Sequence, residues 1–185
     1  MQEEYSYELK IPKERVAVLI GTDGKIKKQI EEETKTNIKV DSREGEVYVS
    51  GSDALSLLAA REIIRAIGRG FNPEVAQLLV KPDYGFEIIA LPDYAKTQND
   101  MVRLKGRVIG REGKSRKIIE ELTQTDICVY GKTIGIIGQA ERVGMARQAV
   151  ITLLEGGTHA SVYKWLEKQQ REMKKAELLG SSDRL

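Results

Sequence analysis

The chain contains few of the residues from which metal clusters and nucleophilic active sites are built. Among 185 residues there is one cysteine, Cys128, and one histidine, His159. A single cysteine cannot form an internal disulfide, and one histidine leaves almost nothing for a metal cluster or a cysteine–histidine dyad. We therefore expect no metal, no cofactor and no enzymatic activity. The scarcity of cysteine favours a reducing, cytoplasmic setting.

The cysteine and the histidine have structural explanations. Cys128 lies between Ile127 and Val129 in an apolar segment, and the alternation of a strand places it on the opposite face from both neighbours. We expect its side chain to be buried beneath the last helix of its domain. His159 stands near the predicted start of a helix, where we expect a surface or capping residue.

Long apolar runs and a basic, apolar leader are also missing. No run of 18 apolar residues occurs, and residues 1–7 carry Glu3 and Glu4. We expect no membrane segment and no signal peptide. The chain is 41% apolar and 31% charged, which suits two small cores with wet surfaces. Its net charge of +2 does not by itself indicate a polyanionic partner, so local clusters of cations must decide.

The chain repeats itself. Residues 19–25 (LIGTDGK) match residues 108–114 (VIGREGK) at an offset of 89, and the similarity continues to Val40 and Val129. After the following loops the offset drops to 87, as a two-residue deletion would produce. Self-similarity at a fixed offset indicates two copies of one structural unit.

The periodicity of apolar residues gives the same order of elements, β-α-α-β-β-α, in both halves. In the first half the predicted elements are residues 5–11, 15–20, 25–35, 37–40, 46–49 and 53–67; in the second they are 86–91, 101–109, 114–123, 126–130, 133–137 and a helix that carries Val143 to Leu153. A further amphipathic helix is predicted over residues 161–179. The predicted domains are 1–72 and 83–157, with a linker and short helix at 73–82 and a C-terminal helix and tail at 158–185.

Two short glycine motifs stand between the first two helices of each copy. The motif Gly-x-x-Gly is weak alone, and a third example at residues 135–138 lies on an apolar predicted strand that could hold no anion. The other two follow an apolar-Ile pair and precede a lysine. Glycines there allow a sharp turn and a close approach of the backbone, and the next helix offers free N–H groups, so phosphate is the expected ligand.

This order of elements, with Ile-Gly-x-x-Gly between the first two helices, resembles the type I KH domain, found twice over nearly the whole chain. The resemblance implies an α+β fold with a three-stranded antiparallel sheet packed against helices in each copy. It also implies that about four nucleotides of single-stranded RNA or DNA cross the loop, with phosphates on one side and bases in an apolar groove on the other.

The residues that would bind RNA follow from this resemblance and from the local clusters of cations. In the second copy they are Gly110, Arg111, Glu112, Gly113, Lys114, Arg116, Lys117, Arg107 and Arg103, with Ile109, Ile127 and Val129 lining the groove. In the first copy they are Gly21, Thr22, Asp23, Gly24, Lys25 and Lys27, with Ile20, Ile38 and Val40.

Two features set these loops apart. The third residue after each motif is commonly apolar in KH domains but is Lys27 here in one copy and Arg116 in the other, which we interpret as an additional phosphate contact. Asp23 places an acid in the first loop, where it would repel the backbone of RNA. We therefore expect the second copy to be the main RNA binder, and the first to serve a protein partner.

The tandem arrangement, the Gly-Phe-Asn-Pro segment at residues 70–73 and the long last helix resemble the archaeal and eukaryotic tandem-KH proteins of small-subunit ribosome assembly, and the archaeal relative of the partner of the Nob endonuclease in particular. The resemblance implies a cytoplasmic factor in ribosomal RNA processing that binds the 3′ region of the small-subunit (16S-type) RNA. Assembly or translation factors are expected partners, and no membrane is.

Two alternatives remain. The KH folds could form a scaffold that docks an endonuclease or a translation factor. Residues 110–115 also end in Gly-Lys-Ser like a nucleotide-binding P-loop. However, that motif needs a glycine where Val108 stands, and it follows a buried strand where residues 103–109 instead indicate a helix.

Overall fold

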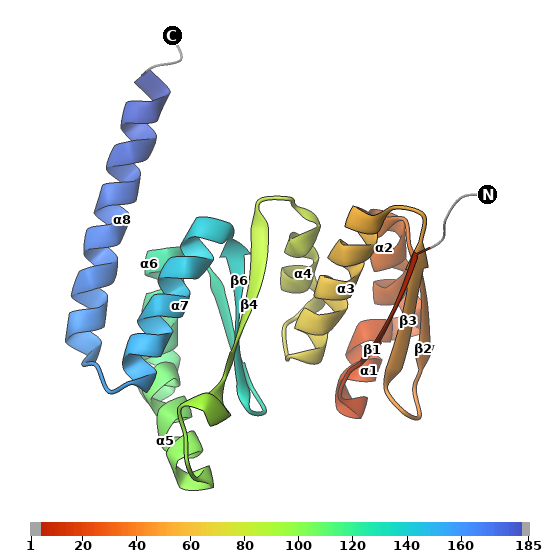
Figure 1. The fold of residues 1–185 in the computed structure, drawn as a ribbon, viewed down its shortest axis with the longest axis horizontal. Helices are drawn as coiled ribbons and strands as arrows, with labels where there is room; N and C mark the ends of the chain where they lie inside the picture. Colours follow the sequence, from red (N-terminus) through yellow and green to blue (C-terminus); the bar gives the residue numbers. More distant parts are fainter. Residues whose placement is uncertain (1–4, 183–185) are drawn as a thin grey trace. The chain divides into compact units, whose positions relative to one another are not determined.

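The computed structural model describes residues 5–182 and divides into two compact units, with the boundary after Phe86 (Figure 1). Each unit contains a three-stranded antiparallel sheet covered by helices on one face. The predicted order β-α-α-β-β-α is present in both, and the α+β fold predicted from the sequence is confirmed.

In the first unit the central strand of the sheet is the last of the three strands in the sequence. The sheet order is β1-β3-β2, so β1 and β2 form opposite edges. The register pairs Val49 of β3 with Tyr7 of β1 and with Ile38 of β2. The elements are β1 (Tyr5–Lys10), α1 (Lys13–Ile20), the 3-10 turn η1 (Thr22–Gly24), α2 (Lys25–Thr34), β2 (Asn37–Asp41), β3 (Glu46–Gly51) and α3 (Ala54–Gly68).

Helix α3 closes the first core because its start is capped and one of its faces is apolar. The side chain of Asp53 accepts a hydrogen bond from Ser56 N at 2.7 Å and satisfies an N–H that the helix cannot. Leu57, Ile63 and Ile67 are fully buried at helical spacing. They pack on the sheet face that carries Val47 and Val49.

The segment predicted as a linker belongs to the first unit. Helix α4 (Pro73–Ala76) and the 3-10 turn η2 (Gln77–Val80) pack along α3. The side chain of Asn72 caps α4 by accepting from Glu74 N at 3.3 Å, and Ala76 and Leu79 are buried. Residues 73–80 therefore pack with the first unit, because buried apolar side chains attach them to α3.

The second unit repeats the topology, with sheet order β4-β6-β5. Its elements are β4 (Tyr84–Ala90), the 3-10 turn η3 (Leu91–Asp93), α5 (Gln98–Ile109), the 3-10 turn η4 (Arg111–Gly113), α6 (Lys114–Thr123), β5 (Asp126–Tyr130), β6 (Thr133–Gln139) and α7 (Ala140–Leu154). Helix α5 begins three residues before its predicted start, because Thr97 caps it by accepting from Asp100 N at 3.1 Å. The third Gly-x-x-Gly lies within β6, as predicted.

The C-terminal helix α8 (His159–Ser182) packs on α6 and α7 through its first turns. Val162 and Leu166 are buried there, and Trp165 packs partly buried beside them. His159 joins this region to α5, because its Nε2 lies 2.8 Å from Arg107 O. The histidine therefore has a structural role at the start of the helix.

The predicted burial of Cys128 is wrong. On β5 it is Ile127 that faces the helices and belongs to the core of the second unit. Because neighbouring residues of a strand point to opposite faces, Cys128 lies on the sheet face away from the helices, where it is half-buried.

Candidate nucleic-acid interface

The two glycine loops have the same backbone conformation. In the first, Gly21 has φ 71° and ψ 176°, Asp23 has φ 53°, and Gly24 has φ 74°. In the second, Gly110 has φ 73° and ψ 174°, Glu112 has φ 54°, and Gly113 has φ 75°. The repeat seen in the sequence is therefore reproduced residue by residue in the loops.

Each glycine of the second loop is required for a different reason. The φ and ψ of Gly110 lie in a region that is essentially accessible to glycine alone, and an added Cβ would come 2.7 Å from Ser115 N. Gly113 is in the left-handed helical region, but a Cβ there would meet nothing within 4 Å. The first glycine therefore allows the close packing of the turn, and the second allows its handedness.

Each glycine loop is followed directly by a helix whose start has no side-chain cap. The residues before α2 and α6 are Gly24 and Gly113, which have no side chain with which to cap the first N–H groups. Those N–H groups and the positive end of the helix point to the loop, where an anion would complete them. Helices α2 and α6 thus each begin with an uncapped end whose polarity suits an anion.

Cations surround the second loop more densely than the first. Arg111, Lys114 and Lys117 are exposed around the start of α6, and Arg103 is exposed on α5 with Asp100 3.6 Å from its Nη2. In the first loop Lys25 and Lys28 are exposed, but Thr22 takes the place of Arg111. The predicted difference in positive charge between the copies is therefore present at the surface.

The acid in the first loop, Asp23, does not distinguish the two copies as the sequence had suggested. Glu112 occupies the same left-handed position as Asp23, and both side chains are exposed. The two loops carry the same charge there. The residue that differs is the one before it, Thr22 in one loop and Arg111 in the other.

Arg107, which the sequence predicts to bind RNA, bonds within the second unit and holds it together. Its Nε donates to Leu153 O at 3.0 Å, and its Nη2 donates to Gly157 O. Arg15 does the same in the first unit, with Nε bonded to Ile67 O at 2.8 Å and Nη2 bonded to Phe71 O at 2.7 Å. Both arginines satisfy carbonyls at the C-terminal end of the last helix.

The side chain of Lys27 is also bonded to other residues of its own unit. Its Nζ lies 2.9 Å from Glu31 Oε1 and 2.9 Å from Ile38 O, so its predicted phosphate contact competes with two internal bonds. Arg116 stands at the equivalent position beside Glu120, at 3.7 Å. A phosphate contact by Lys27 stays a prediction, and it would have to replace these internal bonds.

Glu31 and Glu120 fasten the second helix of each unit to the neighbouring strand. Glu31 Oε1 accepts from Ile38 N at 2.7 Å, and Glu120 Oε1 accepts from Ile127 N at 2.8 Å. Burial raises the pKa of Glu120, and the bond from Ile127 partly opposes that rise. These two residues lie in the acidic runs of the sequence, yet they are tied into the fold.

The predicted apolar groove is only partly accessible. Ile38 and Ile127 are buried in their cores, with 1% and 4% of their surface exposed, so they cannot present a face to a base. Ile20 and Val40 in the first unit, and Ile109 and Val129 in the second, are half-buried beside the loops. These four remain as candidate groove residues.

Sequence reasoning missed a hollow beside this groove. It is lined by Lys39, Val40, Arg43 and Tyr48, among others, around the turn between β2 and β3. Lys39 and Arg43 are exposed cations next to a predicted groove residue. The available signal was their place in the sequence, with Lys39 directly before Val40 and Arg43 in the turn after it.

Other kinds of site find no support in the part of the chain that is described. Within residues 5–182 no group of three or more His, Cys, Asp or Glu side chains is placed to hold a metal ion. The described helices include none that is both long and apolar enough to span a membrane.

Comparison with known proteins agrees with the geometry of the loops. A family model described as a eukaryotic-type KH domain (type I) matches residues 85–171, and a KH-domain model matches residues 6–66. The fold and the two glycine loops thus define a tandem KH-domain protein. Among curated proteins, the KH domain-containing protein MJ0443 of Methanocaldococcus jannaschii is 49% identical over 172 residues, which cover 91% of this chain and 75% of that protein. The chain belongs to this KH-domain family, in which relatives include factors of ribosomal RNA processing.

Eukaryotic relatives and solved structures extend the likeness. The pre-rRNA-processing protein PNO1 of Phaeosphaeria nodorum is 28% identical over 71% of this chain, which spans about half (51%) of its length. Dim2p of Pyrococcus horikoshii is 44% identical, with a TM-score of 0.84 over 89% of this chain and 99% of its own. The Dim2p structure from the same organism in complex with a/eIF2alpha and rRNA matches at 43% identity and a TM-score of 0.86, over 91% of this chain and 96% of that chain.

Proposed function

We propose that this chain binds single-stranded ribosomal RNA as a non-catalytic factor of small-subunit assembly. Its KH domains and its PNO1 relatives support RNA binding and a place in ribosomal RNA processing. The structural neighbour solved with a/eIF2alpha and rRNA is consistent with a ligand from the 3′ region of the small-subunit RNA. The observation that carries the proposal is the pair of uncapped helix ends at glycine loops, the second of which is ringed by exposed cations.

Phosphates are assigned to the loops and bases to the grooves beside them. In the second unit the backbone of residues 110–113 and the N-terminus of α6 receive one phosphate, and Arg111, Lys114 and Lys117 lie within reach of its neighbours. Ile109 and Val129 offer apolar surface to the bases. The first unit binds through the same loop with fewer cations.

The test compares the two loops with one assay. Replacement of Arg111 and Glu112 together by aspartates should weaken binding of a single-stranded oligonucleotide from the 3′ end of small-subunit RNA by about tenfold or more, measured by fluorescence anisotropy. The counterpart in the first loop is Thr22→Asp alone, since Asp23 is already an aspartate, and it should weaken binding less. Equal losses would overturn the ranking of the copies, and a parent chain that binds no single-stranded RNA at low salt would overturn the function.

A scaffold of KH folds that docks an endonuclease or a translation factor remains the second candidate. The observation that favours it is the rRNA complex of the structural neighbour, which also contains a/eIF2alpha. A pull-down with a purified translation factor or a Nob-type endonuclease, in the presence and absence of RNA, distinguishes protein docking from RNA bridging. A cytoplasmic location and the Nob-type partner stay predictions from the sequence.

A further inference from the structure

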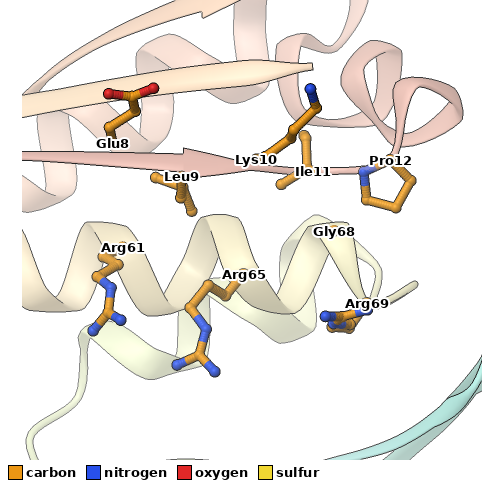
Figure 2. A pocket seen from close by; sticks show the side chains of 9 residues that line it. All are labelled: Glu8, Leu9, Lys10, Ile11, Pro12, Arg61, Arg65, Gly68 and Arg69. Atoms are coloured by element: carbon orange, nitrogen blue, oxygen red, sulfur yellow. The ribbon is translucent and has the colours of Figure 1, made fainter. Parts of the chain in front are cut away.

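A second cationic groove lies at the free edge of strand β1 in the first unit. Figure 2 shows three arginines, Arg61, Arg65 and Arg69, in a row along α3, with Leu9 of β1 facing the helix. The cavity has a volume of about 500 Å³. Leu9, Ile11 and Gly68 contribute its apolar part, and the arginines contribute its charge.

The three arginines have the spacing of a ladder. They are four residues apart, so successive side chains are displaced by about 6 Å along the helix axis. This step is comparable to the separation of neighbouring phosphates in an extended sugar-phosphate chain. The side chains of Arg61 and Arg65 are 36% and 38% exposed, and Arg69 is exposed at the C-terminal end of α3.

One nearby carboxylate neutralises only part of the charge of the ladder, although both of its oxygens accept from Arg65 Nη1, at 2.8 Å and 2.9 Å. Glu62 is shared by two arginines, with Arg65 Nη1 at 2.8 Å and Arg61 Nη1 at 3.5 Å from its Oε1. Figure 2 shows Glu8 pointing away from α3. Arg69 has no hydrogen bond or ion pair from its side chain to any other residue within the described part of the chain. The groove therefore keeps a net positive charge.

Exposed aromatic rings continue the ladder at its N-terminal end. Tyr7 is 43% exposed, and the guanidinium of Arg61 lies 5.1 Å from the centre of its ring. Tyr5 is 44% exposed and lines a small adjoining hollow with Tyr7 and Leu57. A row of cations that continues into exposed tyrosines is the kind of surface that binds single-stranded nucleic acids, because phosphates pair with the cations and bases stack on the rings.

This surface is separate from the glycine loop of the same unit. The sheet order β1-β3-β2 places β1 and β2 at opposite edges. The loop lies at the β2 edge, because α2 is bonded to β2 through Lys27 and Glu31. The arginine ladder lies at the β1 edge.

The second unit has no equivalent ladder. Helices α3 and α7 both have 15 residues, and the positions equivalent to Arg61, Arg65 and Arg69 hold Arg147, Ile151 and Glu155. Arg147 is engaged by Glu87 at 3.8 Å. The ladder is thus a property of the first unit and not of the shared fold.

We propose that the β1–α3 edge of the first unit is a second contact for single-stranded RNA, with Arg61, Arg65 and Arg69 on successive phosphates and Tyr5 and Tyr7 stacking bases. The inference rests on the proposed function, since it adds a surface to the same ligand. RNA that occupies a glycine loop and continues around the domain reaches this edge, so the first unit contributes to binding in spite of its less basic loop.

The test uses two lengths of single-stranded RNA, one of about six nucleotides that fills a loop and groove only and one of about thirty that can reach the edge as well. The variant has Arg61, Arg65 and Arg69 replaced by alanine. We expect its affinity for the longer RNA to fall about tenfold and its salt slope to fall by about 2, with the short RNA unaffected. A matched control replaces three exposed cations of α8, Lys168, Arg171 and Lys174, and removes the same charge.

Each outcome of this test supports or overturns the inference. Unchanged binding of the longer RNA, equal losses for both lengths, or an equal loss in the α8 control would overturn the inference while leaving the proposed function intact. A parent chain that binds neither RNA overturns both. Arg69→Glu guards against misfolding, because the side chain has no partner to lose, and a loss of about threefold for the longer RNA alone is expected. If polyglutamate binds the parent but not the alanine variant, and RNA binds both, the edge is a site for acidic peptides instead.

Discussion

The two KH units reach the same backbone with different side chains at the places that matter for binding. Their glycine loops agree within a few degrees, and both place an acid at the same left-handed position. Yet the first unit has Thr22 where the second has Arg111, and it alone carries the arginine ladder on α3. The repeated fold therefore gives both copies the same loop backbone, and single differences in sequence change the charge around it.

The largest effect is expected where the loop tolerates glycine alone. Gly110→Ala should destabilise the second unit by about 3 kcal/mol, because it combines a forbidden φ and ψ with a Cβ 2.7 Å from Ser115 N. Gly113→Asn should cost less than about 1 kcal/mol, since asparagine tolerates the left-handed region and nothing lies within 4 Å. Urea unfolding measures both. Similar costs at the two positions would contradict the distinction, and Gly21→Ala should behave like Gly110→Ala.

The next effect tests whether Arg15 and Arg107 have the same structural role, although they do not occupy matching positions of the sequence repeat. Arg107→Ala and Arg15→Ala should each cost about 2 kcal/mol, because each leaves two helix-end carbonyls without a donor. Thermal unfolding with hydrogen exchange assigns the loss to one unit or the other. If Arg107→Ala weakens RNA binding without affecting stability, the structural role is wrong and the prediction from the sequence is restored.

The next test exchanges the residue that differs between the two loops, Thr22 in the first and Arg111 in the second. Arg111→Thr should weaken binding of a short single-stranded RNA about fivefold and lower the salt slope by about 0.7, the value for one phosphate contact. Thr22→Arg should strengthen binding by a similar factor. Titrations at several salt concentrations read both quantities. An unchanged slope in both variants would show that position 111 does not meet phosphate.

The smallest effect concerns the glutamates that tie helix to strand. The raised pKa of Glu120 means that the folded state binds the proton more tightly, so this group lowers stability as pH rises through and above the ordinary range of a glutamate. Glu120→Gln keeps the acceptor for Ile127 N and should be more stable than the parent at neutral pH by a few tenths, about 0.3 kcal/mol, with the gain vanishing in acid. Glu31→Gln should lose stability, because Glu31 has Lys27 Nζ at 2.9 Å. The pH dependence of urea unfolding tests the pair.

Sequence reasoning captured the elements and the loops because both depend on local signals. Apolar periodicity predicted every strand of the two sheets to within a few residues, and Gly-x-x-Gly between two helices marked both turns. A residue type alone could not show the partners that a side chain meets inside the fold. Arg107 and Lys27 were assigned to RNA as cations in basic clusters, and only the fold shows the carbonyls and the carboxylate that hold them.

One repeated arrangement was visible in the sequence but had no interpretation there. Thr34 and Thr36 pair at 2.8 Å, as do Thr123 and Thr125, and the first threonine of each pair donates to a carbonyl four residues earlier. The matching threonines were part of the internal repeat. They close the turn between helix and strand, a role that becomes evident only when both side chains are seen to be buried.

The amino-acid sequence by itself determined the duplicated β-α-α-β-β-α order and the position of the two glycine turns, because periodicity and glycine placement act over a few residues. Only the tertiary structure decided which partners each cation meets. Arg107 satisfies helix-end carbonyls about fifty residues away, whereas Arg61, Arg65 and Arg69 line a groove that forms when α3 packs beside β1. The sequence gives the charge of each side chain, but whether that side chain can bind a ligand depends on the partners that folding places beside it.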